Sequence, residues 1–354
     1  MFWLEFSLPR FSVVIPSYNH AAYIGEAIRS VLSQTEADLE LIIVDDGSTD
    51  DSLNVISRFS DPRLKVFTQA NQGAHAAINR GMREASGMYL AILNSDDAYH
   101  PHRLKQTSAI LDANPQVGFV GSHIEIVDSA GRPLGVKHGF NDCPPWLLEA
   151  PERSFRAGTD LKAALLTENY WSTTTNFVYR HEAYEQIGDY RPLRYTHDWD
   201  YALRLARLAP MVLLPEPLIR YRIHPSNTIR ENQVAMIFEI CWILAVHLPA
   251  HLSDQDFSGE NQLHQYLDQL LHSIYVFNMD RVLSVMLLQK LSDNLDQALA
   301  LLDPADNARQ VYLDFIQTHL TGQDDINSKE TLEPPTTTRR AIMGALKKLL
   351  KGTG

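Results

Sequence analysis

The stretch Leu-Glu-Leu-Ile-Ile-Val-Asp-Asp-Gly-Ser, residues 39–48, joins a β-branched apolar run to a polar cluster, and this arrangement recurs in the first hundred residues. Similar apolar runs lie at residues 11–15, 64–67 and 88–93, and helical patterns separate them. Strands that alternate with helices form parallel sheets. The sequence therefore predicts an α/β fold, with a Rossmann-like, mostly parallel sheet flanked by helices.

The helices between these strands are predicted from apolar residues at helical spacing. Ile24, Ile28 and Val31 define the buried face of the first helix. Ser48 and Asp51 have the spacing of a capping box, so we expect the second helix to begin at Ser48.

Composition is that of an ordinary globular protein. The 354 residues carry a net charge of −12, so a nucleic-acid partner is not expected. Only two cysteines are present and they lack metal-site spacing, so we expect neither disulfides nor a structural zinc site, which fits a reducing cytoplasm. The longest nearly apolar stretch, residues 234–248, is shorter than the roughly 20 residues of a membrane span, so we expect no transmembrane helix.

Three polar clusters follow the ends of predicted strands, at residues 16–19, 45–48 and 94–97. Ligands of open α/β sheets bind beyond the carboxyl ends of the strands, so we expect the clusters to meet at one rim. Asp96 and Asp97 offer oxygen ligands to a hard divalent cation whose shell is completed by phosphate oxygens. The alternative is an ordinary turn.

Other residues of the predicted rim also have two interpretations. Tyr18 could stack on a planar base or simply pack. Asp45 or Asp46 could accept hydrogen bonds from a base or a ribose, or cap a helix. Gly73 could let the backbone approach a ligand or merely begin a helix.

The order and spacing of these clusters closely resemble the family 2 glycosyltransferases, whose catalytic domain has the A-type nucleotide-sugar-transferase fold. The motifs are SVVIPSYN at residues 12–19, IIVDDGSTD at 42–50, NQG at 71–73 and LNSDD at 93–97. The resemblance covers about residues 11–225. It implies a nucleotide-sugar donor bound by Pro16, Ser17, Tyr18, Asn19, Asp45, Asp46, Asn71, Gly73, Asp96 and Arg222.

The resemblance further implies a Mn²⁺ or Mg²⁺ ion held by Asp97 and His224. Arg222 and His224 belong to a segment that looks like the closing motif of the family. The alternatives are that Arg222 pairs with acidic neighbours and that His224 is a structural histidine.

A catalytic base is implied on a helix after the sheet, where residues 195–205 look like the corresponding family segment. Asp198 matches the base, although it could instead be a helix N-cap. His197 replaces the usual Glu beside it. Residues 171–176 look like the lining of the acceptor pocket, and an ordinary strand edge is the alternative. The expected acceptor contacts are Trp171 and Thr174 from this stretch, together with His197 beside Asp198.

The expected reaction is an inverting transfer of one sugar, with a UDP-sugar as donor and a glycan or lipid-linked hydroxyl as acceptor, in cell-surface polysaccharide or glycolipid synthesis. A non-catalytic nucleotide-sugar-binding protein is the alternative. A dehydrogenase is disfavoured because no G-x-G-x-x-G follows the first strand. A processive synthase is disfavoured because the Q-x-x-R-W motif is absent.

Residues 1–230 are thus the predicted catalytic domain, and helical patterning predicts a helical appendage over residues 231–320. Residues 321–338 are predicted to form a linker. Residues 339–354 combine basic and apolar residues as an interfacial helix on anionic lipid does, which predicts a peripheral position at the inner face of the membrane. A solvated or dimer-packing tail is the alternative.

Overall fold

The computed structural model describes residues 8–138, 161–167, 169–228, 231–254, 262, 265–266 and 295–320. The chain divides into two compact units, Met1–Leu148 with Tyr170–Pro225, and Glu149–Asn169 with Ser226–Gly354. The predicted linker and basic tail lie outside the described residues.

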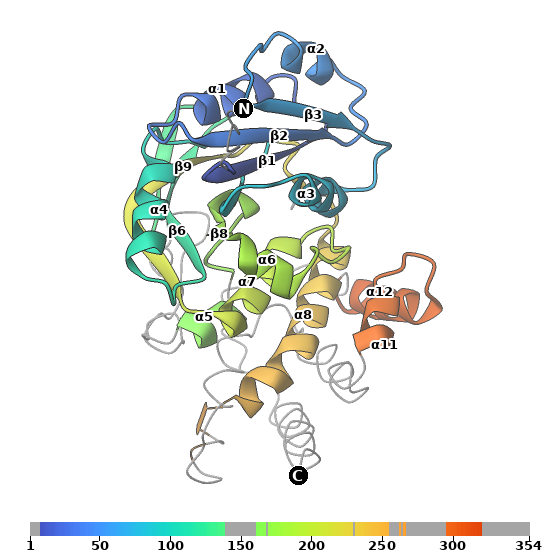
Figure 1. Cartoon of the computed structure of the whole chain (residues 1–354). Helices are drawn as coiled ribbons and strands as arrows, with labels where there is room; N and C mark the ends of the chain where they lie inside the picture. The colour runs from blue at the N-terminus through green and yellow to red at the C-terminus, as the bar shows by residue number, and fades with distance from the viewer. Residues whose placement is uncertain are drawn as a thin grey trace, which may run out of the picture. The chain divides into compact units, whose positions relative to one another are not determined.

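A nine-stranded sheet forms the centre of the described part of the first unit (Figure 1). Its strands are β1 (Phe11–Ser17), β2 (Leu39–Asp45), β3 (Leu64–Thr68), β4 (Tyr89–Ile92), β5 (Ala98–Tyr99), β6 (Phe119–Val127), β7 (Pro133–Lys137), β8 (Val178–Arg180) and β9 (Met211–Arg222). The order is β3-β2-β1-β4-β8-β6-β9-β5, and β7 pairs with β6.

Strands β1 to β4 are parallel to one another, and β6 is parallel to β9. Strand β8 runs antiparallel to β4 and β6, while β5 is antiparallel to β9. All seven residues of β1 and of β2 are buried, as expected of parallel strands with helices on both faces. The predicted mostly parallel sheet is confirmed.

The described helices of the first unit pack against the sheet and against one another. They are α1 (Ile24–Leu32), α2 (Ser52–Ile56), α3 (Ala74–Arg83), α4 (Arg103–Ala113), α6 (His181–Ile187) and α7 (His197–Leu208), with a short 3-10 turn, η3 (Thr174–Asn176), before β8. Residues of α1 and α4 share one hydrophobic cluster with Val13 and Ile43, whereas α3 lies on the other face of β1 (Figure 1).

Helix α2 begins at Ser52, so the predicted start at Ser48 is wrong. The backbone N–H and the hydroxyl of Ser48 both donate to Asp45, which fixes this residue in the loop. Asp50 accepts hydrogen bonds from the N–H and hydroxyl of Ser52 instead. The turn after β2 therefore includes Ser48, which the capping-box spacing assigned to the helix, whereas Asp51 is the N-cap of α2.

The described part of the second unit is helical, with α5 (Leu161–Thr167), α8 (Gln233–Ser253), α11 (Leu295–Ala300) and α12 (Asn307–Leu320). Helix α8 packs against the other three, and Trp242 Nε1 donates to the carbonyl of Ala298 at 2.7 Å. At 21 residues, α8 is long and apolar enough to cross a membrane, so the predicted apolar stretch of residues 234–248 was too short. However, 61% of its apolar window is buried, and buried core helices meet the same criterion.

Candidate functional site

The loops after β1 and β2 are tied together at the carboxyl end of the sheet. Asn19 adopts a positive φ of 53°, and its side-chain oxygen accepts a 2.7 Å hydrogen bond from the Thr49 N–H. Its own N–H donates to the Ser48 hydroxyl at 3.0 Å. Tyr18, next to Asn19, is 44% exposed, so its ring is accessible for stacking on a ligand. The first two polar clusters therefore share one rim, as predicted from the fold class.

Two predicted ligand-binding carboxylates are engaged by the protein itself. Asp45 accepts from the N–H and the hydroxyl of Ser48, three residues on, and so closes the turn after β2. Asp46 is 2% exposed and accepts from the backbone N–H groups of Gln72 and Gly73 at 3.0 and 2.8 Å. In this arrangement Asp45 holds the turn after β2, and Asp46 holds the backbone of residues 72–73.

The remaining predicted rim residues differ in exposure. Asn71 is exposed, and Gly73 needs its glycine because φ is +91°. Pro16 and Ser17 are buried in β1. The Ser17 hydroxyl is buried without a hydrogen-bond partner among the described residues.

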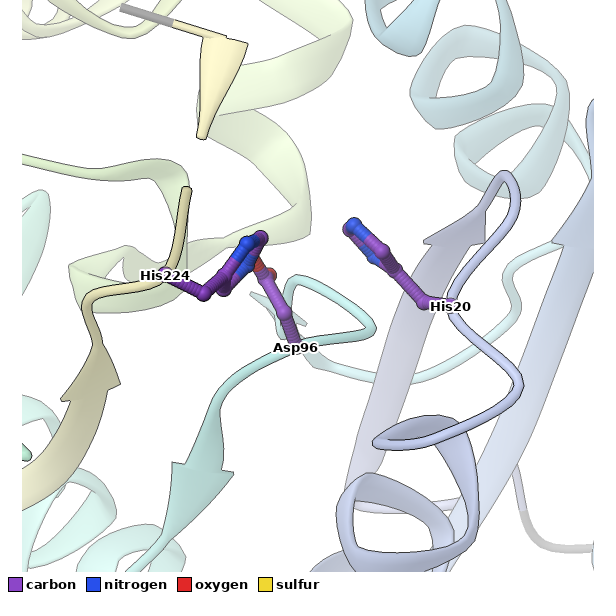
Figure 2. Close-up of side chains that lie close together, drawn as sticks. All are labelled: His20, Asp96 and His224. Carbon is purple, nitrogen blue, oxygen red and sulfur yellow. The ribbon is translucent and has the colours of Figure 1, made fainter. Parts of the chain in front are cut away.

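Asp96 and His224 come together at the same end of the sheet, after β4 and β9. His224 Nε2 and Asp96 Oδ2 are 2.9 Å apart, and a third residue, His20, lies close enough that one ligand atom from each of the three falls within 4.8 Å of the others. Figure 2 shows the three side chains. Burial favours a raised pKa for Asp96, but the His224 hydrogen bond and the charges of His20 and His224 outweigh it and lower the pKa. Two imidazoles and a carboxylate are a donor set that fits a divalent metal.

Asp97, the predicted metal ligand, is not part of this cluster. It is 1% exposed, and its two oxygens accept hydrogen bonds from the Thr175 hydroxyl at 2.5 Å and the Arg222 N–H at 3.0 Å. Burial and the neighbouring charge of Asp96 raise its pKa well above the usual range. Of the adjacent carboxylates, Asp96 is the one that belongs to the cluster with His20 and His224.

Arg222 is buried beneath the site and contacts the loop that carries Asp96. Its guanidinium is 2% exposed, donates to Glu26 Oε2 at 2.7 Å and to the carbonyl of Asp96 at 2.9 Å, and lies 5.0 Å from the centre of the Tyr23 ring. These contacts match the predicted alternative of pairing with an acidic neighbour. The arrangement favours a role in holding the Asp96 loop over direct contact with a diphosphate.

Two of the expected acceptor residues are buried behind the site. Trp171 is fully buried and packs against Phe119, while the Thr174 hydroxyl donates to the side-chain oxygen of Asn94 at 2.7 Å. Together with the Thr175 bond to Asp97, this contact joins η3 to residues 94–97 by two side-chain hydrogen bonds. In the sequence, these contacts are indicated by the run of threonines at residues 173–175.

Asp198, the predicted base, lies in the first turn of α7 and is 9% exposed. Its Oδ1 accepts a local 2.7 Å hydrogen bond from the Trp199 N–H. Asp200 is fully buried and forms ion pairs with Arg191 and Arg204 at 2.7 and 3.0 Å, which gives it a structural role.

Helix α3 connects the rim to the start of α7. Asn79 exchanges two hydrogen bonds with the backbone of Tyr190, before α7, at 2.8 and 2.7 Å. Burial and the charge of His197 lower the pKa of His75, while Asp46 acts to raise it, so His75 interacts with both the rim and the residue beside Asp198. His197 Nδ1 is buried without a hydrogen-bond partner among the described residues and could bind a hydroxyl. Sequence reasoning missed His75 and His20, although His20 directly follows the first polar cluster.

The sequence model of Glycosyl transferase family 2 matches residues 12–188. The chain belongs to this family. An uncharacterized glycosyltransferase of Nostoc sp. is 33% identical to this family 2 chain over 226 residues, which are 62% of the chain and 66% of the relative. Chondroitin synthase of Escherichia coli is 27% identical over 223 residues, 62% of the chain and 30% of the synthase. The chain thus spans less than two thirds of the length of these two relatives.

Solved structures share the fold. S. aureus TarS 1–349 in complex with UDP-GlcNAc has a TM-score of 0.53 and 19% identity, with 92% of this chain and 98% of that chain covered. The mannosyltransferase PcManGT from Pyrobaculum calidifontis, in complex with GDP-Man and Mn²⁺, has a TM-score of 0.52 and 17% identity, with 98% and 88% covered. The resemblance noted in the sequence and the A-type fold are both confirmed.

Proposed function

We propose that this chain is an inverting, metal-dependent glycosyltransferase that moves one sugar from a UDP-sugar to a hydroxyl of a glycan or a lipid-linked acceptor. The observation that carries the proposal is the cluster of Asp96, His224 and His20 at the carboxyl end of the sheet, where the loop with exposed Tyr18 also lies. TarS in complex with UDP-GlcNAc and PcManGT in complex with GDP-Man support a nucleotide-sugar donor.

The proposed roles follow from the side chains. Asp198 accepts the proton of the acceptor hydroxyl, and a positioned carboxylate contributes about 10²- to 10⁴-fold to such a step. His197 Nδ1 offers a polar contact to a sugar or acceptor hydroxyl. When bound by Asp96 and His224, Mn²⁺ or Mg²⁺ would supply Lewis-acid stabilisation of the diphosphate. Attack opposite the leaving group inverts the anomeric carbon, and no carboxylate nucleophile is needed.

The experiment is release of free nucleoside diphosphate from a panel of UDP- and GDP-sugars, with and without candidate acceptors. Acceptor-dependent release that stops on chelation of divalent cations supports the proposal. Thermal stabilisation by a sugar nucleotide without release would support the alternative of a non-catalytic binding protein.

The acceptor and the location are part of the proposal. A lipid-linked acceptor would suit a protein whose residues 339–354 bind the inner face of an anionic membrane. Co-flotation with anionic vesicles that is lost when residues 339–354 are deleted would support this. Equal flotation of the full chain and the truncated chain would contradict it.

A further inference from the structure

His20 comes from a different part of the chain than its two neighbours in the cluster. It follows β1, whereas Asp96 follows β4 and His224 follows β9. In Figure 2, His224 and Asp96 lie against one another and His20 projects from a separate loop. The His20 and His224 rings are edge to face, with centroids 5.6 Å apart. The cluster therefore joins three loops at one point.

The imidazole of His20 is held in position. Its Nδ1 shares a 2.7 Å hydrogen bond with the hydroxyl of Ser95, a residue 2% exposed and adjacent to Asp96. The backbone N–H of His20 donates to the Ser52 hydroxyl at 3.1 Å. A hydrogen bond at one ring nitrogen of a metal-binding histidine fixes the ring and leaves the other nitrogen for the metal. Ser95 would fill that supporting role and leave Nε2 as the ligand.

The spacing also suits a shared cation. Ligand atoms bound to one ion at about 2.1 Å lie about 3 to 4 Å from one another. His224 Nε2 and Asp96 Oδ2 are 2.9 Å apart, and all three ligand atoms are within 4.8 Å of one another.

We propose that His20 is the third protein ligand of the cation, and that the resulting two-histidine, one-carboxylate site prefers a first-row transition metal such as Mn²⁺ to Mg²⁺. Mg²⁺ favours oxygen ligands and holds its waters, whereas imidazole suits transition metals. Three protein ligands leave further positions for the diphosphate and water. This inference rests on the proposed function, because it concerns the cation of the same site.

The test measures Mn²⁺ binding to the full chain without nucleotide, by loss of the free Mn²⁺ signal in electron paramagnetic resonance. His20→Gln should weaken binding at least tenfold, since losing even a residue that supports a ligand costs about 10- to 100-fold. His100→Gln, at an exposed histidine, is the matched control and should bind as wild type does. Mg²⁺ should displace Mn²⁺ from wild type only at an excess of tenfold or more.

Pulsed resonance on Mn²⁺-loaded wild-type protein gives a second readout that requires no variant to fold. We expect couplings from two imidazole nitrogens, and from one in His20→Gln. A single nitrogen in wild type, or unchanged affinity in His20→Gln while Asp96→Asn loses binding, would overturn the role of His20. Neither result would contradict the proposed glycosyltransferase function, because that function is tested separately by release of nucleoside diphosphate.

Discussion

Thr175 donates a 2.5 Å hydrogen bond to Oδ2 of the buried Asp97 carboxylate, while the other oxygen accepts the Arg222 N–H at 3.0 Å. Asp97 thereby joins the loop after β4 to η3 and to the end of β9. These hydrogen bonds hold the loop that carries the adjacent Asp96. Asp97 thus positions the loop, while Asp96 belongs to the cluster with His20 and His224.

A pair of substitutions tests this division. Asp97→Asn should retain Mn²⁺ binding within about threefold, because an amide oxygen can still accept the Arg222 N–H and its NH₂ can donate to the Thr175 oxygen. Asp96→Asn should lose binding by tenfold or more, since the charged ligand is removed. Mn²⁺ titration followed by electron paramagnetic resonance measures both. Equal losses in the two variants would show that Asp97 is itself a ligand.

The fold and the rim were predictable because they depend on local patterns. Four β-branched runs with helical spacing between them predict a parallel sheet, and the rule that ligands gather at its carboxyl ends then places residues 16–19, 45–48 and 94–97 together. The start of α2 was not predictable in this way. Ser48 could serve either a turn or a helix cap, and contacts with Asp45 and Asn19 decide for the turn.

The contacts within the site could not be predicted for a similar reason. Asp96 and Asp97 are chemically identical neighbours, and Asp97 is distinguished by a hydrogen bond from Thr175, which is far away in the chain. Burial of Trp171 and Arg222 likewise depends on packing between distant elements. His20 carried a usable signal, because a histidine directly after the first polar cluster has a metal-binding side chain at the predicted rim.

Asp198→Asn tests the proposed base. The amide cannot accept the acceptor proton, so turnover should fall by about 10²- to 10⁴-fold. Binding of the sugar nucleotide, measured by calorimetry, should change little because the proposed donor contacts lie elsewhere. Turnover near the wild-type value would remove Asp198 from the mechanism.

Asp200→Asn is the contrasting variant on the same helix turn. Its carboxylate is fully buried between Arg191 and Arg204, so the loss should appear in stability, at about 3–5 kcal/mol for breaking a buried ion pair. Urea unfolding measures it. A fully stable variant would contradict the structural role given to this residue.

Glu40 should make stability depend on pH. Burial favours a raised pKa, but hydrogen bonds from Lys65, Ser12 and Ser86 outweigh it and hold the pKa below the usual 4.5. The folded state is therefore stabilised by the ionised form above pH 4.5, and this stabilisation is lost as pH falls through the lower folded pKa. Glu40→Gln should cost about 1–3 kcal/mol at pH 7.

The difference between wild type and Glu40→Gln should shrink below pH 4.5, as followed by urea unfolding at pH 7 and pH 4. Glu84→Gln, at an exposed glutamate that directly follows α3, is the control and should unfold as wild type does at both values. A cost for Glu40→Gln that is the same at pH 4 would contradict the role of its charge.

Gly81 lets α3 approach β1, and its substitution tests that contact. A Cβ at this position would overlap the Val14 side chain, whose branched carbons are fixed within the buried strand. Gly81→Ala should therefore lower the free energy of unfolding by about 1–3 kcal/mol, measured by urea unfolding. Gly25→Ala is the matched control, because its Cβ would sit 3.4 Å from Val55 Cγ1, an ordinary contact. There, alanine should be neutral or stabilise α1 by about 0.5–1 kcal/mol, and similar losses in both variants would contradict the overlap.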